Sequence, residues 1–117
     1  MKILIVDDDQ DMMMITERWL TKAGYEVSRA ASGQEAVDML KKEDFDLVLL
    51  DYSMPDMDGK DTLIAIRKDN EDVKVLFRTG IDDVDIEEVV NDYHANGYVS
   101  KSEGKPKLMA AIDKLLN

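Results

Sequence analysis

The chain has 117 residues, a formal net charge of −11 at pH 7 and no cysteine. Its length suits a single hydrophobic core, so we expect one domain over residues 1–117. The strong negative charge repels phosphate backbones, which argues against direct binding of nucleic acid. Without cysteine, disulfides and thiolate-bound metals are excluded. No apolar run approaches about 18 residues and no leader precedes the first strand pattern, which predicts a cytoplasmic protein without a membrane segment.

Short apolar runs alternate with longer segments of helical periodicity along the chain. This alternation is typical of an α/β fold in which helices cover both faces of a parallel sheet. The expected strands are Lys2–Val6, Tyr25–Arg29, Asp46–Leu50, Val73–Phe77 and Gly97–Ser100.

Helix signals fill the segments that follow the strands. Gly24 suits the end of the first helix, Ser32 to Glu35 form a capping box at the start of the second, and the third begins at Asp58 or Gly59. The apolar stripes are Met12, Ile15, Thr16, Trp19 and Ala23 in the first helix, Ala36, Val37 and Leu40 in the second, Ile86, Val89, Val90 and Tyr93 in the fourth, and Leu108, Ala111, Ile112 and Leu115 in the fifth.

Polar side chains follow four of the five expected strands. Asp7, Asp8 and Asp9 follow the first strand, and Asp51, Thr79 and Lys101 follow the third, fourth and fifth. In an open parallel sheet, ligands bind beyond the carboxyl ends of the strands, where the winding changes direction. If the strand order is 2-1-3-4-5, the first and third strands are neighbours and their carboxylates converge. That crevice is the candidate site.

The segments ILIVDDD, LVLLDYSMPDMDG, FRTG and GYVSK occur in an order and spacing that resemble the receiver domain of bacterial two-component response regulators. The resemblance covers essentially the whole chain. It implies a (βα)5 flavodoxin-like, doubly wound sheet of five parallel strands in the order 2-1-3-4-5. It also implies a signalling module switched by phosphorylation, which assists its own phosphotransfer and dephosphorylation but does not turn over a substrate as an enzyme does.

By this resemblance, Asp51 is the phosphoacceptor. Asp7, Asp8 and Asp51 would repel one another unless a divalent cation lay among them. Mg²⁺ prefers a few oxygen ligands and retains water, so Asp8, Asp51 and the backbone carbonyl of Ser53 are the expected ligands, with Asp7 acting through water.

Three further residues have roles implied by the resemblance. Lys101 would contact a phosphoryl oxygen as a point charge, and Thr79 would donate a hydrogen bond to the phosphoryl group. Movement of Thr79 would let Tyr98 turn inward, which changes the surface of the last strand and the last two helices. The expected partners are a histidine kinase or histidine phosphotransfer protein, and a downstream effector or output domain. A homodimer through the same surface is also compatible with the resemblance.

Two other classes of protein compete with this interpretation. The spacing of Asp7, Asp9 and Asp11 opens like a calcium-binding EF-hand, but Met12 and Arg18 occupy the required glycine and glutamate positions. A phosphatase resembling the haloacid dehalogenase family would use Asp7 and Asp9 as nucleophile and acid. It would leave Asp51 unexplained, and the chain is short for such an enzyme.

The chain departs from the family pattern at three positions, one of which is Gly80, where alanine is usual. Ser102 follows Lys101 where a proline with a cis peptide is usual, so either the backbone there is strained or the loop takes another path. Arg78 precedes Thr79 at a commonly apolar position, and the sequence leaves open whether its side chain is on the surface or reaches the site. Asp9 is expected to be an N-cap rather than a ligand, because it directly precedes the first helix.

Overall fold

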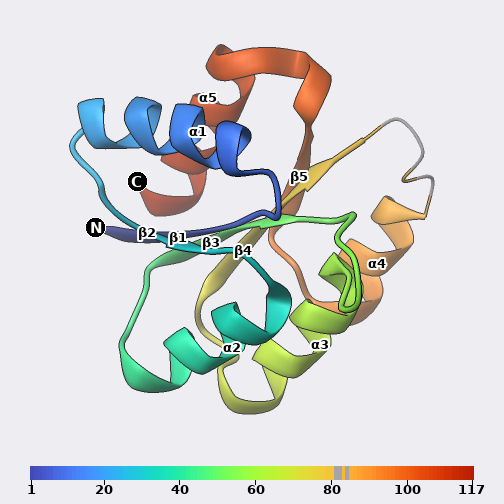
Figure 1. Cartoon of the computed structure of the whole chain (residues 1–117). Helices are drawn as coiled ribbons and strands as arrows, with labels where there is room; N and C mark the ends of the chain where they lie inside the picture. The colour runs from blue at the N-terminus through green and yellow to red at the C-terminus, as the bar shows by residue number, and fades with distance from the viewer. Residues whose placement is uncertain (81–82, 84) are drawn as a thin grey trace.

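The computed structural model describes residues 1–80, 83 and 85–117 (Figure 1). Its five parallel strands form one sheet in the order β2-β1-β3-β4-β5. The predicted fold class and strand order are therefore confirmed. The strands are β1 (Lys2–Val6), β2 (Glu26–Ala30), β3 (Leu47–Asp51), β4 (Lys74–Thr79) and β5 (Gly97–Ser100).

The bounds of β2, β3 and β4 differ from the prediction. β2 and β3 are each displaced by one residue toward the C-terminus, and β4 begins one residue later and ends two residues later than expected. The extension follows from backbone pairing, because Asp51 is still in register with Arg78, and Thr79 with Ser100. Asp51 and Thr79 are therefore the last residues of their strands rather than loop residues, and the sheet fixes their backbones.

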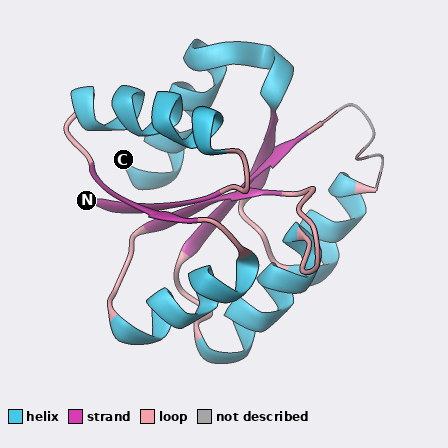
Figure 2. Cartoon of the chain, viewed as in Figure 1, coloured by secondary structure: helices cyan, strands magenta, loops and turns pink. Residues whose placement is uncertain are grey.

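Helices cover both faces of the sheet (Figure 2). One face carries the first and last helices, and the other carries the three between them. The helices are α1 (Gln10–Lys22), α2 (Gly33–Lys42), α3 (Gly59–Asp69), α4 (Ile86–Tyr93) and α5 (Gly104–Leu116), and a short 3-10 helix, η1 (Lys101–Glu103), joins β5 to α5.

The sheet separates two apolar cores because alternate side chains of each strand point to opposite faces. The core under α1 and α5 contains Ile3, Ile5, Met13, Leu20, Leu47, Leu49, Leu76, Val99, Leu108 and Ile112. The core under α2, α3 and α4 includes Leu4, Val6, Val48, Leu50, Leu63, Val75, Phe77 and Val89. The central strands β1, β3 and β4 are buried on both faces, which explains why their sequences are largely continuous apolar runs.

The inward face of α1 differs from the predicted stripe. Met13, Thr16 and Leu20 are buried, whereas Ile15 is 43% exposed. The segment from Met12 to Thr16 is apolar almost all round the helix, so its periodicity did not distinguish one stripe from its neighbour. In α2, α4 and α5 the predicted stripes lie against the core, with Ala36, Val37, Ile86, Val89, Leu108 and Ile112 buried and the others partly buried.

The predicted helix ends are largely confirmed. Asp9 is the N-cap of α1, where its carboxylate accepts the Asp11 and Met12 N–H groups at 3.1 Å. Gly24 has φ +97° just beyond that helix. At α2, the Ser32 hydroxyl accepts the Glu35 N–H as expected. The Glu35 carboxylate, however, accepts the N–H of Ala31 at 3.2 Å, so the capping box does not close on Ser32 itself.

In the part of the chain that the structure describes, no helix has both the length and the apolar character needed to cross a membrane.

Candidate functional site

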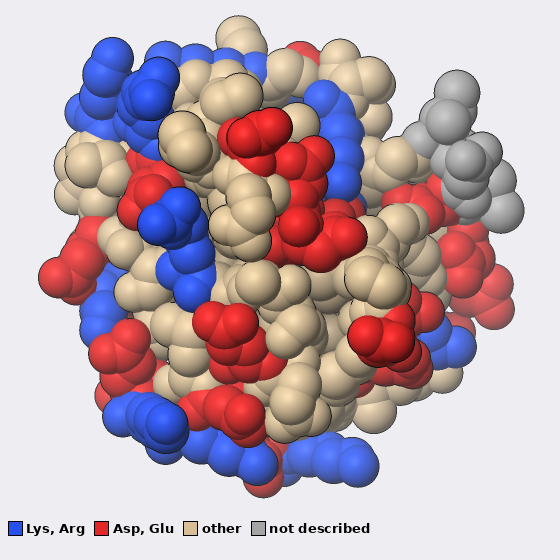
Figure 3. Space-filling view, in the orientation of Figure 1, with Lys and Arg blue, Asp and Glu red and all other residues tan. Residues whose placement is uncertain are grey.

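Three carboxylates meet at the carboxyl edge of the central strands. Asp7, Asp8 and Asp51 each offer an oxygen, and these oxygens all lie within 4.8 Å of one another. Asp7 and Asp51 are buried, whereas Asp8 is exposed. Figure 3 shows acidic side chains gathered over the loop that joins β1 to α1. The predicted convergence of carboxylates from β1 and β3 is therefore present.

Backbone groups orient the two buried carboxylates. The Asp7 carboxylate accepts the Asp9 N–H at 2.9 Å, and the Asp7 N–H donates to the Ala30 carbonyl of β2 at 3.2 Å. Asp51 Oδ1 accepts the Ser53 N–H at 3.3 Å. Both side chains are thus held by loops that begin where their strands end, which preorganises the cluster.

Gly59 brings the start of α3 close to the end of β3. Its N–H donates to the Tyr52 carbonyl at 2.8 Å. A Cβ at this position would lie 2.7 Å from the Tyr52 Cα and 2.9 Å from the Asp51 carbonyl oxygen, too close for any side chain. Glycine therefore lets the loop after Asp51 fold back tightly against the strand.

Lys101 brings a cation to the acidic cluster. Its Nζ lies 2.9 Å from Asp51 Oδ1, and its side chain is 31% exposed. The peptide bond to Ser102 is trans, and Lys101 begins η1, whose N-cap Ser100 accepts the Ser102 N–H at 3.2 Å. The loop thus takes the alternative path that the sequence left open, and the lysine still reaches the carboxylate.

Burial dominates the electrostatics of Asp51. Desolvation raises the pKa of its carboxyl from 3.8 to about 6, the contact with Lys101 opposes this rise, and the charge of Asp7 adds to it. The Asp51 carboxylate is therefore mostly ionised at pH 7, but its charge is costly. Such a perturbed pKa in a cluster of like charges is typical of a functional site.

Arg78 is a second cation beside the acidic cluster. Its side chain is 5% exposed, and Nη1 donates to the Thr16 hydroxyl of α1 at 3.1 Å. Burial lowers the pKa of Arg78, and the charges of Asp7 and Asp51 counteract that shift. The question that the sequence left open is thus answered: the side chain is buried and lies within the field of the site.

The remaining predicted residues lie around the cluster. Thr79 is buried at the end of β4, and Tyr98 is 43% exposed on β5. The Ser53 hydroxyl donates to Asp83 Oδ1 at 2.8 Å, and Asp83 Oδ2 accepts the Gly80 N–H. Asp83 therefore bridges the loops after β3 and β4. No pattern in the acidic segment around it distinguished this residue from its neighbours.

The donor set of the cluster fits a hard divalent cation. Carboxylate oxygens from three residues suit Mg²⁺, which takes few protein ligands and retains water. The geometry does not favour an EF-hand, because the Asp9 carboxylate caps α1 and the gathered oxygens come from Asp7, Asp8 and Asp51. The same capping role leaves Asp9 poorly placed to act as the acid of a dehalogenase-type phosphatase.

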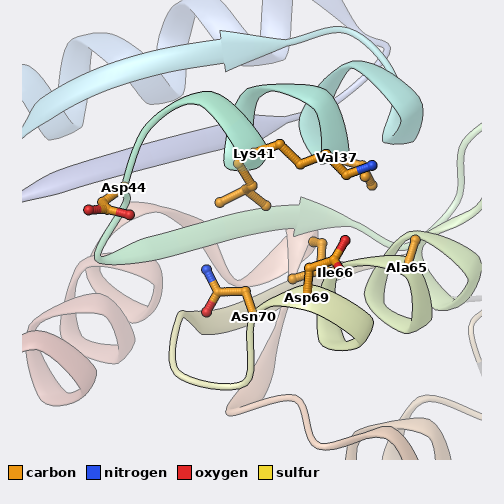
Figure 4. Close-up of a pocket in the computed structure, with 8 residues that line it drawn as sticks. Val37, Lys41, Asp44, Ala65, Ile66, Asp69 and Asn70 are labelled. Atoms are coloured by element: carbon orange, nitrogen blue, oxygen red, sulfur yellow. The ribbon is translucent and has the colours of Figure 1, made fainter.

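A separate pocket lies between the C-terminal halves of α2 and α3 (Figure 4). Its volume is about 330 Å³, and its lining includes Val37, Lys41, Ile66 and Asp69. Because helices run back from the carboxyl ends of parallel strands, this pocket lies at the opposite edge of the sheet from the acidic cluster. It takes no part in the site described above.

The fold and the site define a doubly wound α/β domain with an acidic cluster at its topological switch point. Residues 3–113 match the family described as response regulator receiver domain, and the chain belongs to that family. It is thus a signalling module of two-component systems, for which phosphoacceptor function is typical, as the sequence predicted. Receiver domains interact with histidine kinases or phosphotransfer proteins and with output domains.

Curated relatives of different lengths resemble the chain. Sporulation initiation phosphotransferase F of Bacillus subtilis is 32% identical over 115 residues, which cover 98% of this chain and 93% of that protein. The probable transcriptional regulator ycf27 of Porphyridium aerugineum is 35% identical over 98% of this chain and 48% of its own length. The chain thus spans about half the length of the first curated relatives that it matches.

Solved structures agree closely with this fold. The chemotaxis protein CheY4 of Vibrio cholerae superposes with a TM-score of 0.92 at 28% identity, with 98% of each chain covered. The response regulator TrrA of Thermotoga maritima, in complex with Mg²⁺-BeF, gives a TM-score of 0.89 at 31% identity, again with 98% of each chain covered.

Proposed function

We propose that Asp51 accepts a phosphoryl group with the help of Mg²⁺, and that the resulting acyl phosphate changes the α4-β5-α5 surface that a partner reads. The observation that carries this proposal is the meeting of Asp7, Asp8 and Asp51 at one point, with Lys101 paired to Asp51. The three carboxylates and the lysine come from three separate segments, at the ends of β1, β3 and β5, and have no evident structural need to meet. They do suit the transfer of an anionic group.

The proposed reaction moves a phosphoryl group from a phosphohistidine to Asp51. An Asp51 carboxylate oxygen attacks phosphorus, the new O–P bond forms, and the N–P bond to the imidazole breaks. The imidazole keeps the electron pair and takes up a proton. Phosphoryl transfer needs positioning and neutralisation of oxygens more than covalent assistance, and a bound Mg²⁺ would supply part of that neutralisation.

Residues of the chain would supply the remaining neutralisation and the positioning of the phosphoryl group. Lys101 would transfer its contact from Asp51 to a phosphoryl oxygen, since its ammonium group already lies 2.9 Å from the acceptor carboxylate. Asp8, Asp51 and the Ser53 carbonyl would hold the cation, with Asp7 acting through water. Because burial already makes the charge of Asp51 costly, a cation bound there would relieve an unfavourable interaction.

In the proposed switch, Thr79 responds to the phosphoryl group and Tyr98 then changes its orientation. Thr79 ends β4 next to the site, and its side chain would donate a hydrogen bond to the phosphoryl group. Tyr98 lies on the neighbouring strand β5 and is 43% exposed, so an inward turn would change the surface that a partner meets. A partner that binds the two orientations with different affinity would shift the population between them. That partner would be an effector, an output domain or a second copy of the chain.

The test is exposure of the purified chain to acetyl phosphate, followed by intact mass spectrometry. With Mg²⁺ we expect one added phosphoryl group per chain, and with EDTA none. Asp51→Asn should add none under either condition. Asp44→Asn, which removes an exposed carboxylate at the amino end of β3, is the matched control and should behave like the parent.

The same preparation distinguishes this proposal from a phosphatase. A receiver should not release phosphate catalytically from p-nitrophenyl phosphate, whereas a dehalogenase-type phosphatase should do so through Asp7. Repeated turnover of that ester, together with an unmodified chain after acetyl phosphate treatment, would contradict the proposed function.

A further inference from the structure

Arg78 is a buried charge whose hydrogen bonding is incomplete. Its side chain is 5% exposed, and its Nε has no hydrogen-bond partner among the described residues. The hydrogen bond that the structure gives it goes to the neutral hydroxyl of Thr16, which is itself fully buried. Burial of a charged group is costly unless an opposite charge compensates for it. A threonine hydroxyl alone does not supply that compensation.

Part of that compensation comes from the acidic cluster. Arg78 is the direct neighbour of Asp51 across the β3–β4 pairing. Its side chain points to the face that α1 and α5 cover, because it lies two residues after Leu76 of that core and reaches α1. The negative charges that act on it are those of Asp7 and Asp51, the two buried members of the cluster.

The site therefore contains two cations of different character. Lys101 lies at the edge of the site, is 31% exposed and can exchange its partner when a ligand arrives. Arg78 is enclosed between the sheet and α1 and carries a charge that is permanent under physiological conditions. When all three carboxylates are ionised, these two cations leave the cluster with a single net negative charge.

We propose that Arg78 is a built-in counter-charge of the acidic cluster, which holds Asp7 and Asp51 together before a metal ion binds and weakens the binding of that ion. This inference rests on the metal site of the proposed function and assigns a further residue that determines its affinity. A guanidinium fixed near two metal-ligand candidates repels a divalent cation, and repulsion of this kind in a partly buried site changes affinity by an order of magnitude or more.

With Arg78 present, the carboxylates should stay together without metal. The site should also need a higher Mg²⁺ concentration for saturation than it would without Arg78. Arg78 acts through the carboxylates and has no proposed contact with the phosphoryl group, so it is a positioning residue. Its effect should therefore appear in metal affinity measured without any phosphodonor.

The experiment is calorimetric titration of Mg²⁺ into the parent chain and three variants, after removal of bound metal. Arg78→Met keeps the length and apolar stem of the side chain but removes its charge, and we expect it to bind Mg²⁺ about tenfold more tightly than the parent. Arg78→Lys keeps the charge and should bind within about threefold of the parent. Arg29→Met removes an equal charge from a side chain that is 45% exposed on β2, and should match the parent.

The outcomes separate the two proposals. Mg²⁺ binding by Arg78→Met that equals or is weaker than that of the parent would overturn the role of Arg78, while the metal site itself would stand. A parent chain that binds no Mg²⁺ at all would overturn the metal site. If Arg78→Met folds only after Mg²⁺ is added, that result also supports the counter-charge. If it fails to fold under any condition, Arg78→Gln replaces it with the same expectation of tighter binding.

Discussion

Asp51→Asn should be more stable than the parent chain at pH 7 in the absence of metal, by about 3 kcal/mol, or about 10 °C in melting temperature. The reason is that burial raises the pKa of Asp51 from 3.8 to about 6, so the folded state carries a costly charge at neutral pH. Asparagine keeps the shape of the side chain and removes that charge. Urea unfolding in EDTA measures the difference.

The stability difference between Asp51→Asn and the parent should depend on pH. Between pH 4 and 6 the folded state holds a proton on Asp51 that the unfolded state has lost, so the contribution of Asp51 to the free energy of unfolding of the parent falls as pH rises through this window. The gap between Asp51→Asn and the parent should therefore be close to zero near pH 4 and reach its full size by pH 7. A gap that is constant from pH 4 to 7 would contradict the account.

Mg²⁺ should reduce the stability advantage of Asp51→Asn over the parent. Because a ligand that binds only the folded state stabilises it, the metal should raise the melting temperature of the parent more than that of Asp51→Asn. Asp44→Asn serves again as the control for the loss of one negative charge. Equal responses of the parent and Asp51→Asn to Mg²⁺ would place Asp51 away from the metal.

Lys101→Met should slow phosphoryl uptake from acetyl phosphate by about 100-fold at saturating Mg²⁺. The variant removes the ammonium group that lies 2.9 Å from Asp51 and that we propose contacts a phosphoryl oxygen. Lys105→Met, at an exposed position in the first turn of α5, is the matched control and should retain the rate of the parent. The rate is followed by intact mass spectrometry at timed intervals.

A second measurement separates the two contributions of Lys101. Loss of its charge should raise the pKa of Asp51 further, and the resulting protonation reduces the population of the nucleophilic carboxylate at pH 7. That part of the defect should disappear at pH 9, while the part due to the missing phosphoryl contact should persist. A variant within threefold of the parent at pH 7 would contradict the proposed role of Lys101.

The sequence predicted the fold and the centre of the site because both depend on short-range patterns. Apolar runs that alternate with helical segments indicated a parallel sheet, and the acidic residues at the ends of β1 and β3 indicated the crevice. The structure brings Asp7, Asp8, Asp51 and Lys101 together as this reasoning required. The roles of Ser53, Thr79 and Tyr98 remain proposals that depend on the phosphorylated state.

Features that depend on tertiary contacts were harder to predict from the sequence. The exposure of Ile15 depends on how α1 is rotated about its axis, and a segment that is apolar almost all round does not fix that rotation. Arg78 stood out in the sequence as a charge at a position that is commonly apolar in the family, but its burial depends on a tertiary contact, the hydrogen bond to Thr16 of α1. The path after Lys101 depends on the 3-10 turn that Ser100 caps, where the usual proline is missing.

The most direct test of the account is to locate the phosphoryl group on the parent chain. After treatment with acetyl phosphate and Mg²⁺, borohydride reduction converts an aspartyl phosphate to homoserine, which peptide mass spectrometry assigns to a single position. If Asp51 is the phosphoacceptor, we expect homoserine at position 51 alone, and only when Mg²⁺ is present. Homoserine at position 7 or 8, or equal modification of position 51 in EDTA, would contradict it.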